Sequence, residues 1–442
     1  MRKVALKIIL MLSATLLLGA IGIEAMSNVF YYAKRGKIFY LDVRENKPVQ
    51  EGAYTAAEAV FHPYYSYIHR TGRSGGWWTT NNVGFQILTK LAETEPGCCD
   101  YPIAKREGEV LVGVFGGSVA TGFALAAQGS PEFAEQLSRV PAWSGKRIRI
   151  LNFAMPGFKQ PQQLLTLAYY LSIGQHFDLV INIDGFNEVV TSQRNWAAGT
   201  EPSFPADTLW GEWGRQLEKQ AMAFDKGSSD QYLGAYLRTL SANWQRRAEE
   251  CKFATCFAFR KVVADMAGAR AAANQTEARP SEEKRTIFPT ATHSLLGTNF
   301  NIFDYTASQW AESSKGMADL IRPTGAIYLN VIQPNQWWVK FGNYEPIAKD
   351  HIYTWVIELI NEGYPRMVGK MPILLEKGVS VFDATAAFRG QAWRDVYVDD
   401  CCHYTEKGND ILGTAIAGEV RRLVSDKTTF GVPATLSLSA VK

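Results

Sequence analysis

The residues of this sequence best suited to chemistry are a serine in a glycine-rich turn and an aspartate–histidine pair far along the chain. Gly116-Gly117-Ser118 follows an apolar run, and Asp400 stands three residues before His403. One short turn can bring such a carboxylate back to the imidazole, where it fixes the tautomer and supports the positive charge of the ring. The pattern therefore predicts a charge-handling pair that could remove the proton of a serine hydroxyl.

Two further segments carry hydrogen-bond donors. Gly157, at the end of the segment 152–157, could present its backbone N–H to a bound anion, and Asn187, in the segment 184–188, could donate from its side-chain amide. Alone, each signal has a plainer interpretation: Ser118 as a helix N-cap, and the other two residues as turn formers. Only their combination predicts a site.

A fourth polar segment, Gln333-Pro-Asn335-Gln336, follows another apolar run, and we expect Gln333 and Asn335 to contact a substrate. Other chemistries fit less well. A phosphate-binding loop would need a Lys-Ser/Thr ending that Ser118 lacks. The neighbours Cys401, Cys402 and His403 match no common zinc spacing, so we predict neither a metal nor a cofactor.

The elements that must position these residues can be read from the apolar pattern. Short β-branched runs, as expected of strands buried on both faces, occupy residues 109–115, 147–153, 177–183, 325–332 and 379–382. Helical patterns occupy residues 131–140, 160–173, 307–321, 348–361 and 408–423. This alternation predicts an α/β fold with a parallel sheet and helices on both faces. Ligands of such sheets bind beyond the carboxyl ends of the strands, where the polar segments fall.

The order and strand-end placement of the motifs resemble those of the SGNH, or GDSL-like, hydrolase superfamily. The resemblance covers about residues 108–190 and 322–425. It implies a flavodoxin-like, three-layer α/β/α fold. It also implies that the activity is the cleavage of an ester through an acyl-enzyme.

The resemblance assigns a role to each motif. Ser118 becomes the nucleophile, His403 the general base and then acid, and Asp400 its orienting carboxylate. The N–H groups of Ser118 and Gly157 and the side chain of Asn187 become the oxyanion hole. The sequence departs from the common family pattern at Gly117, where aspartate is usual, and after Asn187, where glutamate replaces aspartate.

The N-terminus predicts export. Arg2, Lys3 and Lys7 accompany the apolar run 8–23, as in a secretory signal or a membrane anchor. We expect residues 1–27 to be retained as an anchor rather than cleaved. The catalytic domain would then lie outside the cytoplasm, in the periplasm, or would be secreted if cleavage occurred.

The remaining organisation follows the changes of pattern. Residues 28–107 form an irregular region with aromatic-rich stretches and no helical period. The domain of residues 108–425 is interrupted by a helical insertion, 191–320, which could be a lid or a passive elaboration. Residues 426–442 form a C-terminal tail.

Six cysteines occur as three local pairs. Cys251 and Cys256 could close a short disulfide loop in an exported protein. Neighbouring cysteines cannot easily bond to one another, so we expect Cys98/Cys99 and Cys401/Cys402 to bond elsewhere if they form disulfides.

Composition narrows the function. A net charge of +3, from 46 basic and 43 acidic residues without a basic stripe, argues against nucleic acid as a partner. We expect a serine esterase that acts on O-acetyl groups of envelope or extracellular polysaccharide. The alternatives are an O-acyltransferase of polysaccharide assembly, a lipase or thioesterase with an apolar lid, and a non-catalytic protein that binds glycan.

Overall fold

The computed structural model describes residues 2–41, 59–198, 200–206, 251–276, 300–338 and 354–429, with parts of 237–248. It divides the chain into two compact units. The smaller unit comprises Met1–Ala53 and Gly214–Ile287, and the larger unit comprises Tyr54–Trp213 and Phe288–Lys442.

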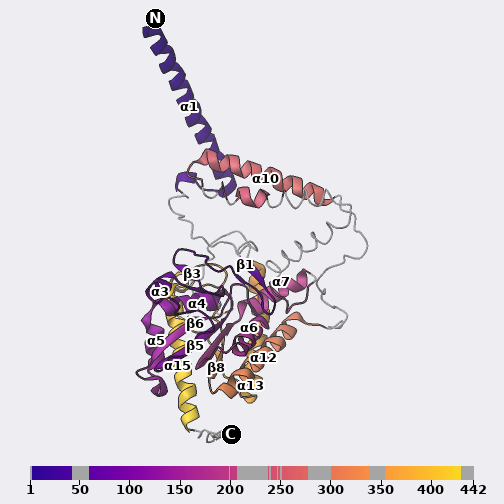
Figure 1. Cartoon of the computed structure of the whole chain (residues 1–442). Coiled ribbons are helices and arrows are strands. Elements are labelled where there is room, and N and C mark those ends of the chain that lie inside the picture. Colours follow the sequence, from indigo (N-terminus) through magenta and orange to yellow (C-terminus); the bar gives the residue numbers. More distant parts are fainter. Residues whose placement is uncertain are drawn as a thin grey trace, which may run out of the picture. The chain divides into compact units, whose positions relative to one another are not determined.

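A five-stranded, wholly parallel sheet forms the centre of the larger unit (Figure 1). Its strands, in spatial order, are β6 (Arg147–Asn152), β5 (Glu109–Gly116), β7 (Leu179–Asp184), β8 (Ile327–Ile332) and β9 (Val381–Asp383). Numbered along the chain, this order is second, first, third, fourth and fifth, as in flavodoxin-like doubly wound folds. All five expected strands and the parallel α/β sheet are confirmed.

Side-chain alternation along the central strand separates two cores. In β5, Val110, Val112 and Val114 face one core, whereas Leu111 and Phe115 face the other. All residues of β5 and β7 are buried, which explains why both read as nearly continuous apolar runs.

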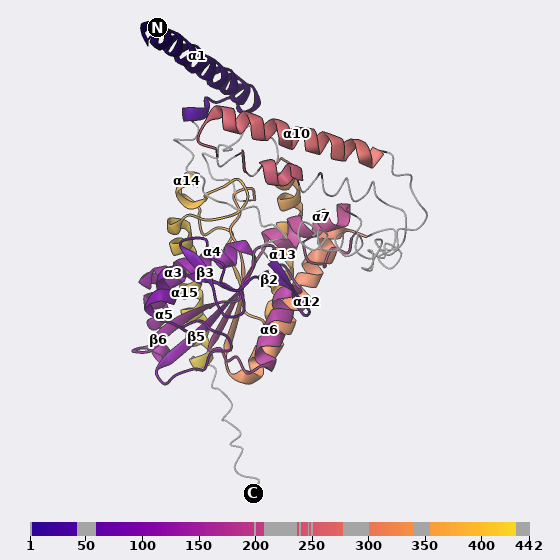
Figure 2. The ribbon, with the colours of Figure 1, turned by 45° about the horizontal axis from the view of Figure 1, so that its top comes forward.

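Helices cover both faces of the sheet, giving three layers (Figure 2). One core includes α4 (Ser118–Gly129), α5 (Pro131–Ser138) and α15 (Glu406–Thr429); the other includes α6 (Gln162–Ser172), α12 (Ile302–Ile321) and α13 (Thr354–Glu376). Short helical turns complete the unit at Pro141–Trp143, Asn187–Thr191, Ser192–Ala197 (α7), Arg322–Thr324 and Trp393–Val396 (α14).

The region before the sheet is more regular than we expected. Two antiparallel hairpins pair β1 (Ala59–His62) with β2 (Ser66–His69), and β3 (Trp78–Thr80) with β4 (Gln86–Leu88); the helix α3 (Thr89–Thr94) follows. Strands of three or four residues carry too little periodicity to stand out in a sequence.

The smaller unit is built on two helices, α1 (Arg2–Arg35) and α10 (Ala254–Thr276). Tyr31 and Phe39 pack edge-on, and Tyr31 does the same against Phe257. The expected disulfide between Cys251 and Cys256 is present beside them.

None of the described helices combines the length and apolar character needed to cross a membrane. The membrane anchor that we expected over residues 1–27 is therefore not supported. Instead, the helix that contains this segment continues without interruption to Arg35.

The expected insertion, residues 191–320, is divided between the two units of the chain. The helix expected from residue 307 begins at Ile302 and packs in the larger unit, whereas α10 belongs to the smaller one. Within the insertion the sequence also predicts helices at 210–224, 231–250 and 257–273. The first lies outside the described residues, and the second is described only in parts of 237–248. Residues 339–353 and 430–442 also lie outside the described residues.

The carboxylate of Glu24 caps the first turn of α10. It accepts hydrogen bonds from Ala254 N at 2.6 Å and Thr255 N at 3.0 Å, and also from the hydroxyls of Thr255 and Tyr40. These N–H groups have no partner within their own helix, so the side chain of one helix satisfies the end of another.

Replacing Glu24 with alanine should therefore destabilise the start of α10. We expect a loss of about 1 kcal/mol, typical of an N-cap, and faster hydrogen exchange at the amides of Ala254 and Thr255. Met26→Ala is the matched control, because Met26 lies on the same helix and is 75% exposed. Unchanged exchange in Glu24→Ala would contradict the capping role.

Candidate active site

The polar residues of interest gather where two neighbouring strands end. Ser118 begins α4 two residues after β5, and Asn187 follows β7, which pairs with β5. In this sheet order, the gap between these two strands is the topological switch point, where such folds bind ligands.

A chain of hydrogen bonds connects a serine, a histidine and an aspartate at this place. His403 Nε2 lies 2.7 Å from Ser118 Oγ, and His403 Nδ1 lies 2.5 Å from Asp399 Oδ2. With Nδ1 donating its proton to the carboxylate, Nε2 carries a lone pair and accepts from the serine hydroxyl. This is the arrangement that lets a histidine remove the proton of an attacking serine.

The carboxylate on the histidine belongs to Asp399 and not to Asp400, so our assignment of Asp400 was wrong. Asp399 Oδ1 accepts from three successive backbone N–H groups, those of Cys401, Cys402 and His403, at 2.9, 2.9 and 3.2 Å. These bonds fold the loop around Asp399 and leave its second oxygen to face the imidazole.

The electrostatics of Asp399 fit this role. Burial acts to raise its pKa, but the hydrogen bonds from His403 and from backbone N–H groups outweigh burial, so the pKa lies below its ordinary value. An ionised carboxylate at neutral pH can support the imidazolium that forms when the histidine takes a proton.

The segment that we expected to contact a substrate instead holds this loop from behind. Gln333 and Asn335 are 4% and 0% exposed. Asn335 Nδ2 donates to Cys401 O at 3.4 Å, Gln336 Nε2 to Asp399 O at 3.2 Å, and the Trp337 indole to the Asp400 carbonyl at 2.8 Å. The structure thus gives this segment a positioning role, and substrate contact by Gln333 and Asn335 has no geometric support.

The segments that carry the three expected oxyanion-hole donors pack against one another. Asn187 Nδ2 donates to Phe158 O at 2.9 Å, which fixes the amide beside Gly157 and leaves its second N–H available. Among the described residues, no group accepts from the backbone N–H of Ser118 or of Gly157. Gly157 has a φ of +80°, a backbone conformation that favours glycine.

This packing explains the glycine before the serine. A Cβ atom at Gly117 would lie 2.2 Å from Asn187 Nδ2 and 3.0 Å from Phe158 O. The aspartate that is common in the related motif would therefore displace the Asn187 amide, so the departure at Gly117 is a steric requirement of this site.

The departure at Glu188 also has a structural reason. The Glu188 carboxylate is buried, and it accepts from Gly185 N at 2.7 Å and from Gln160 N at 3.2 Å. The longer side chain thus joins the loop after β7 to the segment that carries Gly157. Burial raises the pKa of Glu188.

A second buried acid lies beneath the same loops. Asp184 accepts from Gln163 at 3.1 Å, from the Trp310 indole at 3.0 Å and from Asn330 at 3.0 Å. Burial and the neighbouring charge of Glu188 raise the pKa of Asp184 well above its ordinary value. This polar network ties β7, β8, α6 and α12 together directly under the site.

Lys159 is buried beside this network, with its ammonium group bonded to the carbonyl of Pro202. Burial lowers its pKa to about 7, although the charges of Glu188 and Glu201 act in the opposite direction. Lys159 carries no signal in the sequence that would single it out, because a single lysine next to a turn is ordinarily a surface residue.

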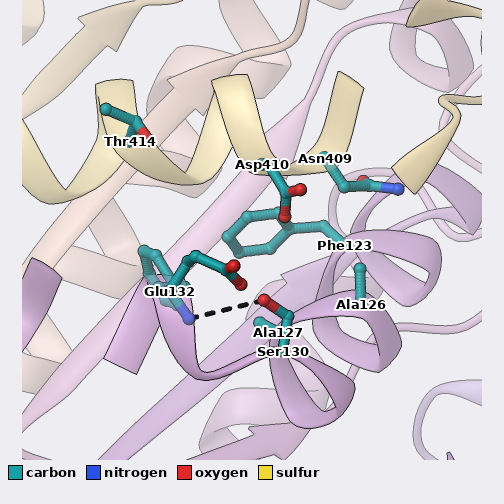
Figure 3. A pocket seen from close by; sticks show the side chains of 9 residues that line it. Phe123, Ala126, Ala127, Ser130, Glu132, Asn409, Asp410 and Thr414 are labelled. Atoms are coloured by element: carbon teal, nitrogen blue, oxygen red, sulfur yellow. Dashed lines mark hydrogen bonds between the residues drawn. The ribbon is translucent and has the colours of Figure 1, made fainter. Parts of the chain in front are cut away.

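A small pocket elsewhere on the larger unit is not this site. It lies between the second half of α4 and the start of α15, lined by Ala126, Ser130, Glu132 and Asp410 among others (Figure 3). Ser118 stands at the opposite end of α4.

The whole chain was compared with known proteins. No protein-family profile matches it, and no curated protein matches it. Two crystal structures are similar to this chain. One is of a protein from Bacteroides fragilis that is described as an acylhydrolase. The other is of a protein from Bacteroides thetaiotaomicron that is described as a GDSL-like lipase. The first is 9% identical, with a TM-score of 0.32, over 76% of this chain and 96% of the other. The second is 11% identical, with a TM-score of 0.31, over 76% and 97%. At such identities the function has to be argued from the geometry of the site.

Separate substitutions of Asp399 and Asp400 test which of the two acids supports His403. Asp399→Asn should slow the reaction of Ser118 with a fluorophosphonate by up to about 10⁴-fold, because the amide favours the wrong imidazole tautomer. Asp400→Asn should lose far less of this rate, because the carboxylate that faces His403 Nδ1 belongs to Asp399. The measurement is the rate of adduct formation by mass spectrometry. Equal losses in both variants would contradict the assignment.

The buried Lys159 should make stability depend on pH. An ordinary lysine has a pKa of 10.5, against about 7 in the folded chain. Between these values the unfolded chain binds a proton that the folded chain lacks. The free energy of unfolding should therefore rise with pH, by at most about 1.4 kcal/mol per pH unit.

Lys159→Met should remove this contribution. We expect the stability of the variant relative to wild type to fall steadily from pH 7 to pH 9 in urea titrations. Lys146→Met, at an exposed lysine, is the control and should give a constant difference. A pH-independent difference for Lys159→Met would show that the lysine is protonated in the fold.

Proposed function

We propose that this protein is a serine hydrolase of ester bonds that works through an acyl-enzyme on Ser118. The observation that carries the proposal is the hydrogen-bonded chain from Ser118 Oγ through His403 to Asp399. A protein that only binds a glycan has no need of an ionised carboxylate behind a histidine on a serine.

The chemistry follows from the positions of the groups. Ser118 Oγ attacks the ester carbonyl while His403 Nε2 takes the serine proton, and Asp399 supports the resulting imidazolium. The carbonyl oxygen becomes an anion beside the N–H groups of Ser118 and Gly157 and the Asn187 amide. Removing one such donor typically costs about 3–4 kcal/mol of transition-state stabilisation.

The second half of the reaction reverses the proton transfers. The imidazolium of His403 gives its proton to the leaving alcohol, and the same ring then activates a water molecule that attacks the acyl group on Ser118. A sugar hydroxyl in place of water would give transfer instead of hydrolysis. Both outcomes use the same groups, so the acceptor alone separates an esterase from an acyltransferase.

We further propose that the ester is carried by a polysaccharide. Phe61, Tyr64 and Trp77 are exposed aromatic residues in or beside the two hairpins. Tyr67, in the same region, donates from its hydroxyl to Pro156 O at 3.0 Å, directly before the glycine of the oxyanion hole. Exposed aromatic rings near a site offer rigid apolar faces with polar edges, which suit the faces of sugar rings.

The proposed compartment is outside the cytoplasm. The disulfide between Cys251 and Cys256 supports this proposal, because disulfides persist mainly in oxidising compartments. The basic and apolar start of the chain is the second support.

The central test uses the full chain and p-nitrophenyl esters. We expect turnover of p-nitrophenyl acetate by the wild type and a loss of at least about 10³-fold in kcat in Ser118→Ala. Butyrate and octanoate esters in parallel rank the acyl groups, and preference for octanoate would favour a lipase. Absence of any turnover that depends on Ser118 would refute the hydrolase.

A second assay addresses the acceptor and the polymer. The enzyme is incubated with an O-acetylated oligosaccharide, and release of acetate is followed with and without an unacetylated oligosaccharide. Free acetate in both cases indicates hydrolysis, whereas acetylated acceptor identifies transfer. No release from any acetylated glycan, despite activity on p-nitrophenyl acetate, would contradict the polysaccharide substrate.

A further inference from the structure

Two pairs of consecutive cysteines have unusually close sulfur atoms. Cys401 Sγ lies 2.7 Å from Cys402 Sγ, and Cys98 Sγ lies 2.7 Å from Cys99 Sγ. None of these four cysteines is joined in a disulfide. The separation is shorter than contact between non-bonded sulfurs and approaches the about 2.05 Å of a disulfide bond. Each pair could therefore close with little further movement of its sulfurs, provided that the peptide between the two cysteines can twist.

We propose that Cys401 and Cys402 form a reversible disulfide that displaces His403 and thereby switches off the activity of Ser118, so that in the oxidising compartment proposed above the activity depends on a reductant. The regulatory part rests on the function proposed above, but the disulfide itself does not. The two pairs differ in access. Cys401 is only half-buried, whereas Cys98 and Cys99 are 6% and 3% exposed, so an oxidant reaches Cys401 first.

The oxidation proceeds by thiol–disulfide exchange. The Cys401 thiolate attacks a small disulfide, such as oxidised glutathione, and forms a mixed disulfide while one thiolate leaves. The Cys402 thiolate then attacks Sγ of Cys401 and expels the second thiolate. The two cysteine protons end on the two released glutathione thiols, and the two electrons have passed to glutathione.

Closing the disulfide must change the conformation of the loop that holds His403. Adjacent Cα atoms are about 3.8 Å apart, whereas disulfides ordinarily join Cα atoms about 4.4–6.8 Å apart. A bond between neighbours therefore closes a small ring and twists the peptide group within it. That peptide carries the Cys402 N–H, which donates to Asp399 Oδ1 at 2.9 Å.

Losing this donor affects the site directly. Asp399 is held in place by the N–H groups of the loop, and its other oxygen binds His403. When the carboxylate is no longer fixed, the imidazole loses its orientation toward Ser118. A displacement of about 1 Å in such a group can lower the rate about 100-fold.

A metal ion bound at Cys401 and Cys402 would explain the short distance between their sulfur atoms less well than a disulfide does. Ligand atoms of Cys401, Cys402 and His403 lie within 4.8 Å of one another. However, both ring nitrogens of His403 are already engaged, by Asp399 and by Ser118. Two thiolates that each stand about 2.3 Å from a zinc ion would also lie farther apart than 2.7 Å.

The first experiment tests the bond without reference to activity. The full chain is equilibrated with reduced and oxidised glutathione at several ratios, with EDTA present, then alkylated and digested with trypsin. Peptide 395–407 should lose both alkylation sites on oxidation, whereas peptide 91–105 keeps its two. Two alkylated cysteines in peptide 395–407 at every ratio would overturn the proposal.

The second experiment measures p-nitrophenyl acetate hydrolysis in the same samples. Activity should fall about 10–100-fold as the disulfide forms and return with dithiothreitol. Relative to its own activity without glutathione, Cys401→Ser should be insensitive to glutathione, whereas Cys98→Ser should be inhibited like wild type. Equal inhibition of Cys401→Ser, or full activity of the oxidised protein, would overturn the switch.

The two readouts separate the possible failures. If even the reduced protein shows no activity, the proposed hydrolase function fails, and the peptide masses still decide whether the disulfide forms. If Cys401→Ser does not fold, the wild-type correlation between disulfide content and activity tests the switch by itself.

Discussion

The hydrogen bond between Ser118 and His403 is the interaction on which the other features of the site depend. It joins residues 285 positions apart in the chain, at a distance of 2.7 Å. The serine is placed by the sheet, since β5 ends two residues before it. The histidine is placed by a loop that folds around Asp399. The rigid sheet and this compact loop must agree to within a fraction of an ångström for the proton transfer to work.

Many of the buried polar residues hold the sheet and the histidine loop in the relative position that this hydrogen bond requires. The segment 333–337 binds three backbone carbonyls of the histidine loop, and Glu188 joins the loop after β7 to the segment containing Gly157. Asp184, at the end of β7, accepts from amide and indole donors of α6, α12 and β8. Such groups are costly to bury unless they are hydrogen-bonded, so each bond constrains the arrangement of the loops above.

The sequence was sufficient for the elements that repeat a simple pattern. The five strands are apolar runs, and the serine and Asn187 follow from their places at strand ends. The histidine was found from its short spacing to an acid. The sequence was not sufficient to choose between Asp399 and Asp400, because both acids fit a short turn. The choice depends on which carboxylate receives the loop N–H groups, and thus on backbone dihedral angles.

Contacts between distant segments explain two other differences between the sequence-based predictions and the structure. Gln333 and Asn335 are polar residues at a strand end, which usually indicates a binding surface, but both are buried, and Asn335 donates to a loop more than sixty residues later. The need for glycine at position 117 likewise arises from Asn187, seventy residues away. Contacts between distant segments leave no periodic trace, so sequence patterns alone do not reveal them.

The start of α4 at Ser118 has a consequence for the end of the reaction. The positive end of the helix dipole faces the space that also receives the N–H groups of Ser118 and Gly157. This field favours any anion, including the carboxylate that ester cleavage leaves behind. Under the proposed function, the architecture that would stabilise the oxyanion would also retain the acid product, so product departure would compete with chemistry in setting the turnover rate.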